Sequence, residues 1–122
     1  MMREVCFLIG TDGQVLYSDA SSSPSSMPDS RQRWQAIWDR RDVLVEIAHS
    51  HPRGPAAFSS TDESTMSALS GALGRAPRYS VVTPVAMIVR VGERTETVNP
   101  EPWWADLLRL ASGMAALQTE EE

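Results

Sequence analysis

The segment VLVEIAHSHP, residues 43–52, joins a β-rich run to two closely spaced histidines. Aliphatic and β-branched side chains dominate Val43 to Ala48, which therefore predicts a strand. Successive side chains of a strand point to opposite faces, so His49 and His51 should project from the same face at its end. Pro52 cannot donate a hydrogen bond to a sheet and stops the strand after the pair. Two imidazoles that face the same way are half of a zinc site.

Asp62 supplies a third donor a short distance after the histidines. Residues 53–58 contain a Gly-Pro pair and predict a loop that turns the chain back. Three protein ligands, His49, His51 and Asp62, would leave a fourth position open for water. That pattern is typical of catalytic rather than structural zinc sites.

The same residues also have simpler interpretations. Ser59-x-x-Asp62 and Ser60-x-x-Glu63 are both helix-capping patterns, ahead of a helix expected from Thr61 to Leu73. The histidines, the only two of the chain, would then be an accidental surface pair. Capping and metal binding are compatible, because a side chain in a first helical turn can still face a metal.

The remaining segments predict one α/β layered domain with a mixed sheet. An N-terminal hairpin leads into a flexible Ser- and Pro-rich loop over residues 18–28, which has little to bury. A C-terminal helix from about residue 101, in a segment that extends to Leu117, is expected to cover the sheet. Its apolar stripe comprises Trp103, Leu107, Leu110 and Met114. The other expected elements are strands over Val5 to Gly10, Gln14 to Tyr17, Tyr79 to Thr83, Val85 to Val91 and Thr95 to Val98, and a helix from Asp29 or Ser30 to Arg41 with a stripe of Trp34, Ile37 and Trp38.

Composition narrows the function classes. A chain of 122 residues with 42% hydrophobic content suits a single domain over 1–122. No apolar run is long enough to span a bilayer, and a net charge of −5 argues against nucleic-acid partners. The single cysteine, Cys6, excludes an internal disulfide and fits a cytoplasmic location. The four tryptophans are interpreted as packing residues.

The sequence HSHP at 49–52, followed by Ser59-x-x-Asp62, resembles the motif H-x-H-P…S-x-x-D of the JAMM (JAB1/MPN/Mov34) zinc metalloprotease superfamily. The upstream part of that motif, E-x-C-G-L-x-G, is matched by the stretch from Glu4 to Gly10, with Phe7 in place of the first glycine. The resemblance is to the small prokaryotic type and extends from residue 4 to about residue 98.

The resemblance implies a single MPN/JAB-like α/β domain, with a mixed β-sheet flanked by helices in a cytidine-deaminase-like layering. It implies that His49, His51 and Asp62 hold Zn²⁺. In the same family pattern, Glu4 is the general base that deprotonates the attacking water. Ser59 is the hydroxyl that hydrogen-bonds the tetrahedral intermediate.

The implied activity is that of a metallo-isopeptidase or peptidase. Its substrate would be an amide bond next to the C-terminal tail of a ubiquitin-like or sulfur-carrier protein. Two alternatives remain open at this point: a non-catalytic MPN-type interaction module, and a DNA-repair-associated JAB relative whose His-x-His-Pro-x-Gly variant Gly54 would fit. A homodimer is also expected if part of the apolar surface stays exposed.

Three features depart from the family pattern. Only three residues precede Glu4, where relatives carry a strand and a helix, so Glu4 is expected to be loosely held. Phe7 and Glu46 stand where glycine is common. Cys6 shares a strand face with Glu4, so it is expected either to approach the metal or to be a core residue.

Overall fold

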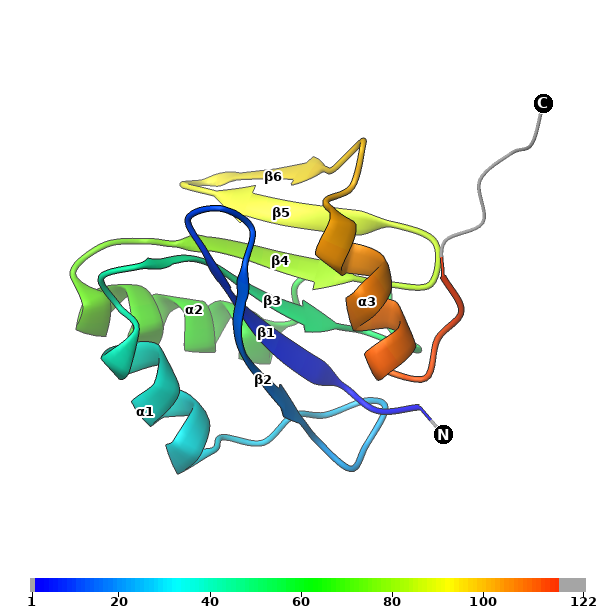
Figure 1. Cartoon of the computed structure of the whole chain (residues 1–122), viewed down its shortest axis with the longest axis horizontal. Helices are drawn as coiled ribbons and strands as arrows, with labels where there is room; N and C mark the ends of the chain where they lie inside the picture. Colours follow the sequence, from blue (N-terminus) through cyan, green and yellow to red (C-terminus); the bar gives the residue numbers. More distant parts are fainter. Residues whose placement is uncertain (1, 117–122) are drawn as a thin grey trace.

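The computed structural model describes residues 2–116 and builds them into a six-stranded sheet with three helices (Figure 1). The strand order is β2-β1-β3-β4-β5-β6, and only the β3–β4 pair is parallel. The strands are β1 Val5–Gly10, β2 Val15–Ala20, β3 Leu44–Ser50, β4 Arg78–Val82, β5 Met87–Val91 and β6 Arg94–Thr97. The helices are α1 Arg31–Asp39, α2 Ser60–Leu73 and α3 Trp103–Ala111. The predicted α/β class with a mixed sheet is confirmed.

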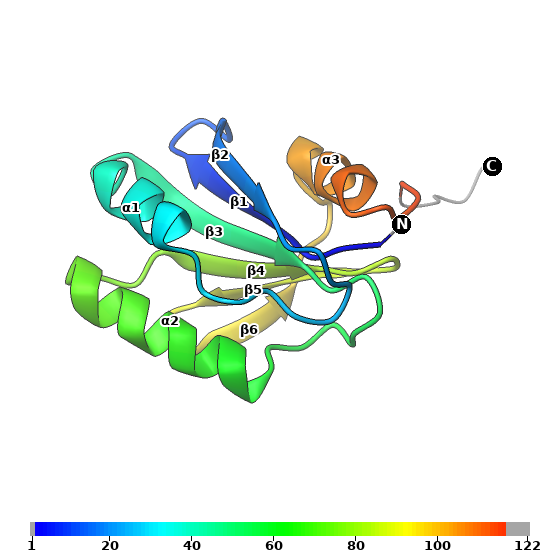
Figure 2. The same ribbon diagram turned by 90° about the horizontal axis from the view of Figure 1, so that it is seen from below.

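Helices pack against both faces of the sheet. Helices α1 and α2 cover one face, and α3 covers the other (Figure 2). Each face of the sheet has its own hydrophobic core, and alternate residues of β1 belong to different cores. Cys6 and Leu8 pack beneath α1 and α2, whereas Phe7 and Ile9 pack beneath α3. This alternation follows from the two-residue period of a strand, and it explains why all six residues of β1 are buried.

The end of β3 is tied to the start of β1 and to the end of α3. The hydroxyl of Ser50 is fully buried and accepts a hydrogen bond from Val5 N at 2.9 Å. The Ser112 hydroxyl lies 2.7 Å from the same oxygen. Arg3 N donates to Ser112 O at 3.0 Å, so the beginning of the chain lies against the end of α3 (Figure 1).

The predicted apolar stripe of the C-terminal helix is wrong. Helix α3 does cover the sheet, but Trp103, Leu107 and Leu110 are 64%, 42% and 59% exposed. Of the four predicted residues only Met114 is buried, and it lies beyond the helix. The residues that face the sheet are Trp104, Ala105, Leu108 and Arg109.

Arg109 explains why the other face of α3 is the buried one. Its guanidinium is 0% exposed and pairs with Glu101 at 2.6 Å and Asp106 at 2.8 Å. Its Nε also donates to Thr83 O at 2.8 Å. A fully paired arginine can occupy a core position, so the helix turns this side inward.

Other boundaries also need correction. The flexible loop was predicted over 18–28, but residues 18–20 belong to β2. They pair with β1, where Ala20 lies opposite Val5, and Arg33 forms an ion pair with Asp19 at 2.7 Å.

Two further predictions differ from the structure. Trp38 is 47% exposed rather than packed, and Arg41 stacks on its ring. The predicted strand from Val85 begins only at Met87, because Ala86 N and Val85 N bond to the Thr83 hydroxyl in a turn. The C-terminal segment was expected to reach Leu117, which lies outside the described residues.

Helix α2 agrees with the expectation. It runs from Ser60 to Leu73 with Ser59 as N-cap, and Gly74 ends it at a φ of 75°. That left-handed conformation favours glycine over any residue with a side chain. Within residues 2–116, no helix is long and apolar enough to cross a membrane.

The two faces of α3 allow a direct test. Leu108→Ala removes a fully buried side chain and should lower the free energy of unfolding by about 3 kcal/mol. Leu107→Ala is the matched control on the exposed face and should change it by less than about 0.5 kcal/mol. Urea unfolding of both variants measures the difference. Equal losses would mean that the helix is docked through a different face.

Glu46 is a buried carboxylate on the α3 side of the sheet. Its side chain is 9% exposed, and its Oε2 has no hydrogen-bond partner among the described residues. Arg78 Nε lies 3.9 Å from Oε1, but this arginine is half exposed, and the buried Ser80 hydroxyl nearby is also unbonded. Burial is the largest influence on this carboxyl group and raises the pKa of Glu46 above its usual value.

This carboxylate predicts a pH-dependent stability. A raised folded-state pKa favours the folded protein when Glu46 is protonated, and this stability is lost as the pH rises through that pKa. Glu46→Gln should therefore raise the urea midpoint relative to the parent at pH 8, with a smaller gain near pH 4. Glu93→Gln, at an exposed turn position, is the control and should give the same difference from the parent at both pH values. A gain for Glu46→Gln that grows toward acid pH would contradict the assignment.

Candidate metal centre

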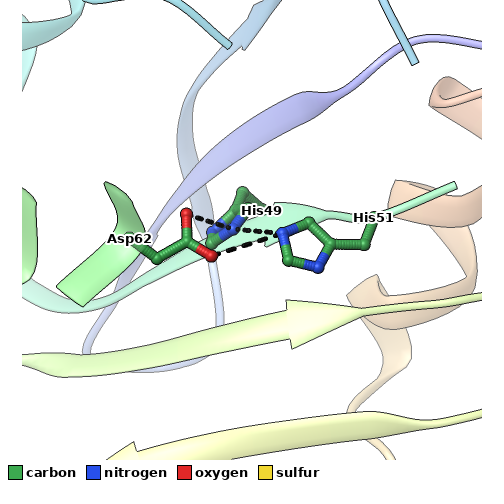
Figure 3. Close-up of side chains that lie close together, drawn as sticks. All are labelled: His49, His51 and Asp62. Atoms are coloured by element: carbon green, nitrogen blue, oxygen red, sulfur yellow. Dashed lines mark hydrogen bonds and ion pairs between the residues drawn. The ribbon is translucent and has the colours of Figure 1, made fainter. Parts of the chain in front are cut away.

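Three side chains from two elements converge at one end of the sheet (Figure 3). His49 lies near the end of β3, His51 follows the strand by one residue, and Asp62 lies in the first turn of α2. Asp62 Oδ1 is 3.3 Å from His49 Nε2, and its Oδ2 is 3.4 Å from His51 Nε2. The two Nε2 atoms are 3.1 Å apart. The grouping predicted from sequence is therefore present.

These separations fit a small tetrahedral ion. Two ligand atoms that bind such an ion at about 2.0–2.1 Å lie roughly 3.3 Å from each other. The two distances from an Nε2 atom to a carboxylate oxygen, and the distance between the two Nε2 atoms, fall close to this value. Imidazole nitrogen and carboxylate oxygen are also donors that divalent transition metals accept. His49, His51 and Asp62 could thus hold a metal ion with little movement.

Asp62 serves the helix and the site together. Its Oδ2 accepts from Ser59 N at 2.8 Å, while the Ser59 hydroxyl accepts from Asp62 N at 3.0 Å. This is a complete capping box at the start of α2. Because the carboxylate still faces both histidines, the capping interpretation and the metal interpretation hold at once. Ser59 is exposed, and its hydroxyl hydrogen is free to donate because the cap uses the oxygen as acceptor.

The carboxylate of Asp62 and the two imidazoles shift the pKa values of the cluster in directions that favour a negatively charged Asp62. Partial burial would raise the pKa of Asp62, but hydrogen bonds from His49 and His51 lower it well below its usual range. Burial would likewise lower the pKa of His51, but hydrogen bonds to Asp62 and to Pro55 O outweigh this and raise it. The carboxylate is therefore ionised at neutral pH, which is the form that binds a cation.

The loop after β3 orients His51. The Nδ1 of His51 lies 3.2 Å from Pro55 O, and a carbonyl oxygen can only accept, so Nδ1 carries the hydrogen. This tautomer leaves the Nε2 lone pair pointing at the site, as in carbonyl–histidine–metal arrangements. A Cβ on Gly54 would lie 3.3 Å from the Cβ of His51 and 3.4 Å from its ring, so glycine lets the loop approach closely.

Glu4 lies in the same place and is firmly held. Glu4 is 7% exposed, and its carboxyl group lies close enough to His49, His51 and Asp62 to interact with their charges. Its N–H donates to Ser23 O at 2.8 Å, and its carbonyl accepts from Ser21 N at 2.9 Å. The expectation that Glu4 is loosely held is therefore wrong, because the serine-rich segment pairs with its backbone. Burial raises the pKa of Glu4, while the two histidines act in the opposite direction.

Cys6 is a core residue rather than part of the cluster. It is 3% exposed and packs in the core beneath α1 and α2. Burial raises the pKa of its thiol to about 12, so it is protonated at neutral pH. Among the described residues, the group suited to a metal consists of His49, His51 and Asp62 alone.

A cavity of about 570 Å³ opens at this cluster. Its lining includes every residue predicted for the site: Glu4, His49, His51, Ser59 and Asp62. The structure thus brings all five together. Sequence reasoning missed Pro55 O, the Ser21–Ser23 backbone and Ser50 as supporting groups. The Gly-Pro pair predicted a turn in the loop that holds Pro55. No local sequence pattern predicted the backbone contacts of Ser21 and Ser23.

Comparison with known proteins agrees with this geometry. The family model described as prokaryotic homologs of the JAB domain matches residues 3–106, which includes the cluster, Glu4 and all six strands. No curated protein matches the chain. The match covers most of the sequence, and His49, His51 and Asp62 lie together as a group that could hold a metal ion. The chain therefore belongs to the family of prokaryotic JAB-domain homologs.

Proposed function

We propose that this protein is a JAMM-type zinc metalloprotease that hydrolyses an amide bond next to the C-terminal tail of a ubiquitin-like or sulfur-carrier protein. The observation that carries the proposal is the convergence of His49, His51 and Asp62 at tetrahedral spacing. They line a cavity that also contains Glu4 and Ser59. Membership of the JAB family, which includes metalloproteases, supports the same conclusion.

The chemistry divides between the ion and the chain. A bound zinc ion supplies Lewis acidity, which polarises a carbonyl and makes a water more acidic. Glu4 can accept the proton of the attacking water at its carboxylate and return it to the leaving amine. The burial of Glu4 beside the histidines suits this task, because a carboxylate shielded from solvent is a stronger base. Its backbone is held on both sides, which keeps the carboxylate in place.

Ser59 is suited to stabilise the developing oxyanion. Its oxygen is oriented by the bond from Asp62 N, and its hydrogen remains available to the substrate. Since Ser59 is exposed at the cavity, a substrate carbonyl can reach it. A donor preset in this way needs no reorganisation when charge appears.

An extended, glycine-rich tail can bind by adding to a sheet edge. β2 is an edge strand, and it lies beside β1, the strand that Glu4 precedes. The proposal includes a cytoplasmic location, which the buried, reduced Cys6 supports. It also includes a homodimer, for which Trp103, Leu107 and Leu110 offer an exposed apolar surface on α3.

The two alternatives are less well supported. A non-catalytic interaction module has no need of a buried carboxylate beside an intact ligand set, and Glu4 is such a group. For a DNA-repair-associated relative, Gly54 was the only sequence feature, and its contact with His51 gives it a structural role in any case. The net charge of −5 also argues against a nucleic-acid substrate.

Zinc content tests the ligand set. The purified protein should hold about one zinc per chain, and His49→Ala or His51→Ala should remove it because two ligands hold the ion weakly. Asp62→Asn should lower the zinc content while keeping the helix cap, since an amide oxygen can accept from Ser59 N. Elemental analysis with circular dichroism measures metal and fold together. Unchanged zinc in His49→Ala would rule out this site.

Hydrolysis tests the assigned roles. The assay substrate is a ubiquitin-like carrier protein whose Gly-Gly tail is fused to a reporter. Glu4→Gln should keep zinc but lose hydrolysis, because an amide cannot accept the proton. Ser59→Ala should keep zinc and lower the rate by roughly 10²–10³.

Glu63→Gln is the control for the removal of a carboxylate near the site. Glu63 follows Asp62 but is exposed and paired with Arg90, so this change should leave the rate unchanged. Full activity of Glu4→Gln would show that another residue is the base.

A further inference from the structure

The cavity at the metal-binding cluster continues well beyond the polar residues. From His49 and Asp62 it extends between α1 and α2, which lie on the same face of the sheet (Figure 2). Residues 24–29 also line it. Its inner lining is mostly apolar and comprises Cys6, Trp34, Ile37, Ile47, Met66 and Leu69.

The size of the cavity exceeds what the reaction centre needs. One water takes about 30 Å³ of liquid volume, whereas the cavity measures about 570 Å³. That volume falls within the range of small-molecule binding sites, roughly 300–1,000 Å³. The space left beside an ion and a water is therefore large enough for a substrate side chain.

Two polar side chains of the lining, Arg33 and Tyr79, are already bonded within the protein. Arg33 pairs with Asp19 at 2.7 Å and donates to Pro28 O at 2.7 Å. The hydroxyl of Tyr79 lies 2.9 Å from the Ser70 hydroxyl and donates to Met66 O at 3.2 Å. A ligand beside Arg33 and Tyr79 would therefore contact polar groups that already have hydrogen-bond partners, together with apolar side chains. Such surroundings favour an apolar ligand group over a charged one.

The occupant of the cavity follows from the chemistry of the two sides of the scissile bond, and this step rests on the proposed function. A Gly-Gly tail forms the carbonyl side and has no side chain that could enter the cavity. The group that fills it must then belong to the residue that carries the scissile nitrogen. We propose that this cavity binds an aliphatic or aromatic side chain of that residue, so that the enzyme selects its substrate on the amine side.

A binding experiment tests the cavity without relying on hydrolysis. The probes are acetohydroxamate and 4-phenylbutanohydroxamate, which share a metal-binding group and differ in their apolar part. Calorimetry on the zinc-loaded protein should show at least tenfold tighter binding of the phenyl compound. Met66→Trp, which fills the cavity from α2, should reduce this ratio to near one. Ser67→Trp is the matched control, because the neighbouring residue is exposed and does not line this cavity, and it should keep the ratio.

A kinetic experiment tests whether the enzyme recognises the residue that carries the scissile nitrogen. Carrier fusions with Phe, Leu, Gly or Asp directly after the Gly-Gly tail should differ in kcat/KM by at least tenfold in favour of Phe and Leu. Met66→Trp should remove the preference and retain zinc. If that variant melts far below the parent, Thr65→Trp at the same cavity replaces it.

The outcomes separate the two proposals. Equal affinity for both hydroxamates in a zinc-loaded protein would overturn the inference about the cavity and leave the proposed function intact. Equal kcat/KM for the four carrier fusions would overturn the assignment to the amine side. A protein that holds no zinc and does not bind acetohydroxamate would overturn the proposed function, and this inference with it.

Discussion

The antiparallel register between β1 and β3 determines the arrangement of the whole site. Cys6 pairs with His49 in this register, so these two side chains share a face of the sheet, as do the residues two positions away from each. Glu4 therefore lies on the side to which His49 and His51 project. A shift of one residue would turn the glutamate toward α3 and exchange the two cores. Such a shift would be very unfavourable, because all six residues of β1 are buried and their side chains fill closely packed cores on both faces.

Ser50 connects the two faces of the sheet. It lies between the histidines in sequence but points the other way, where it bonds to Val5 N and contacts Ser112 after α3. The strand end that carries the histidines is thus anchored from the face opposite the cluster of His49, His51 and Asp62. The Arg3–Ser112 bond adds the residue before Glu4 to the same anchor. The packing of α3 therefore contributes to the placement of groups that it never touches.

Local patterns predicted a large part of this structure, and non-local contacts account for the errors. The strand into His49 and His51 and the capped helix that begins near Asp62 follow from spacing and turn chemistry, and both are confirmed. The inward face of α3 was missed because it depends on Arg109 meeting Glu101 and the Thr83 carbonyl. The support of Glu4 was missed for the same reason, since its partners lie about twenty residues away in a segment without any pattern.

The double role of Asp62 has a consequence for how such domains diverge. Its carboxylate closes the capping box and also faces the histidines, but an asparagine could fulfil the first role without the second. Under the proposed function, a single substitution at this position would therefore yield a descendant with the same helix, the same core and a weakened metal site. The architecture of the domain and the composition of its candidate metal site can thus change independently at one side chain. Recruitment of the domain as a scaffold would then require no rebuilding of its interior.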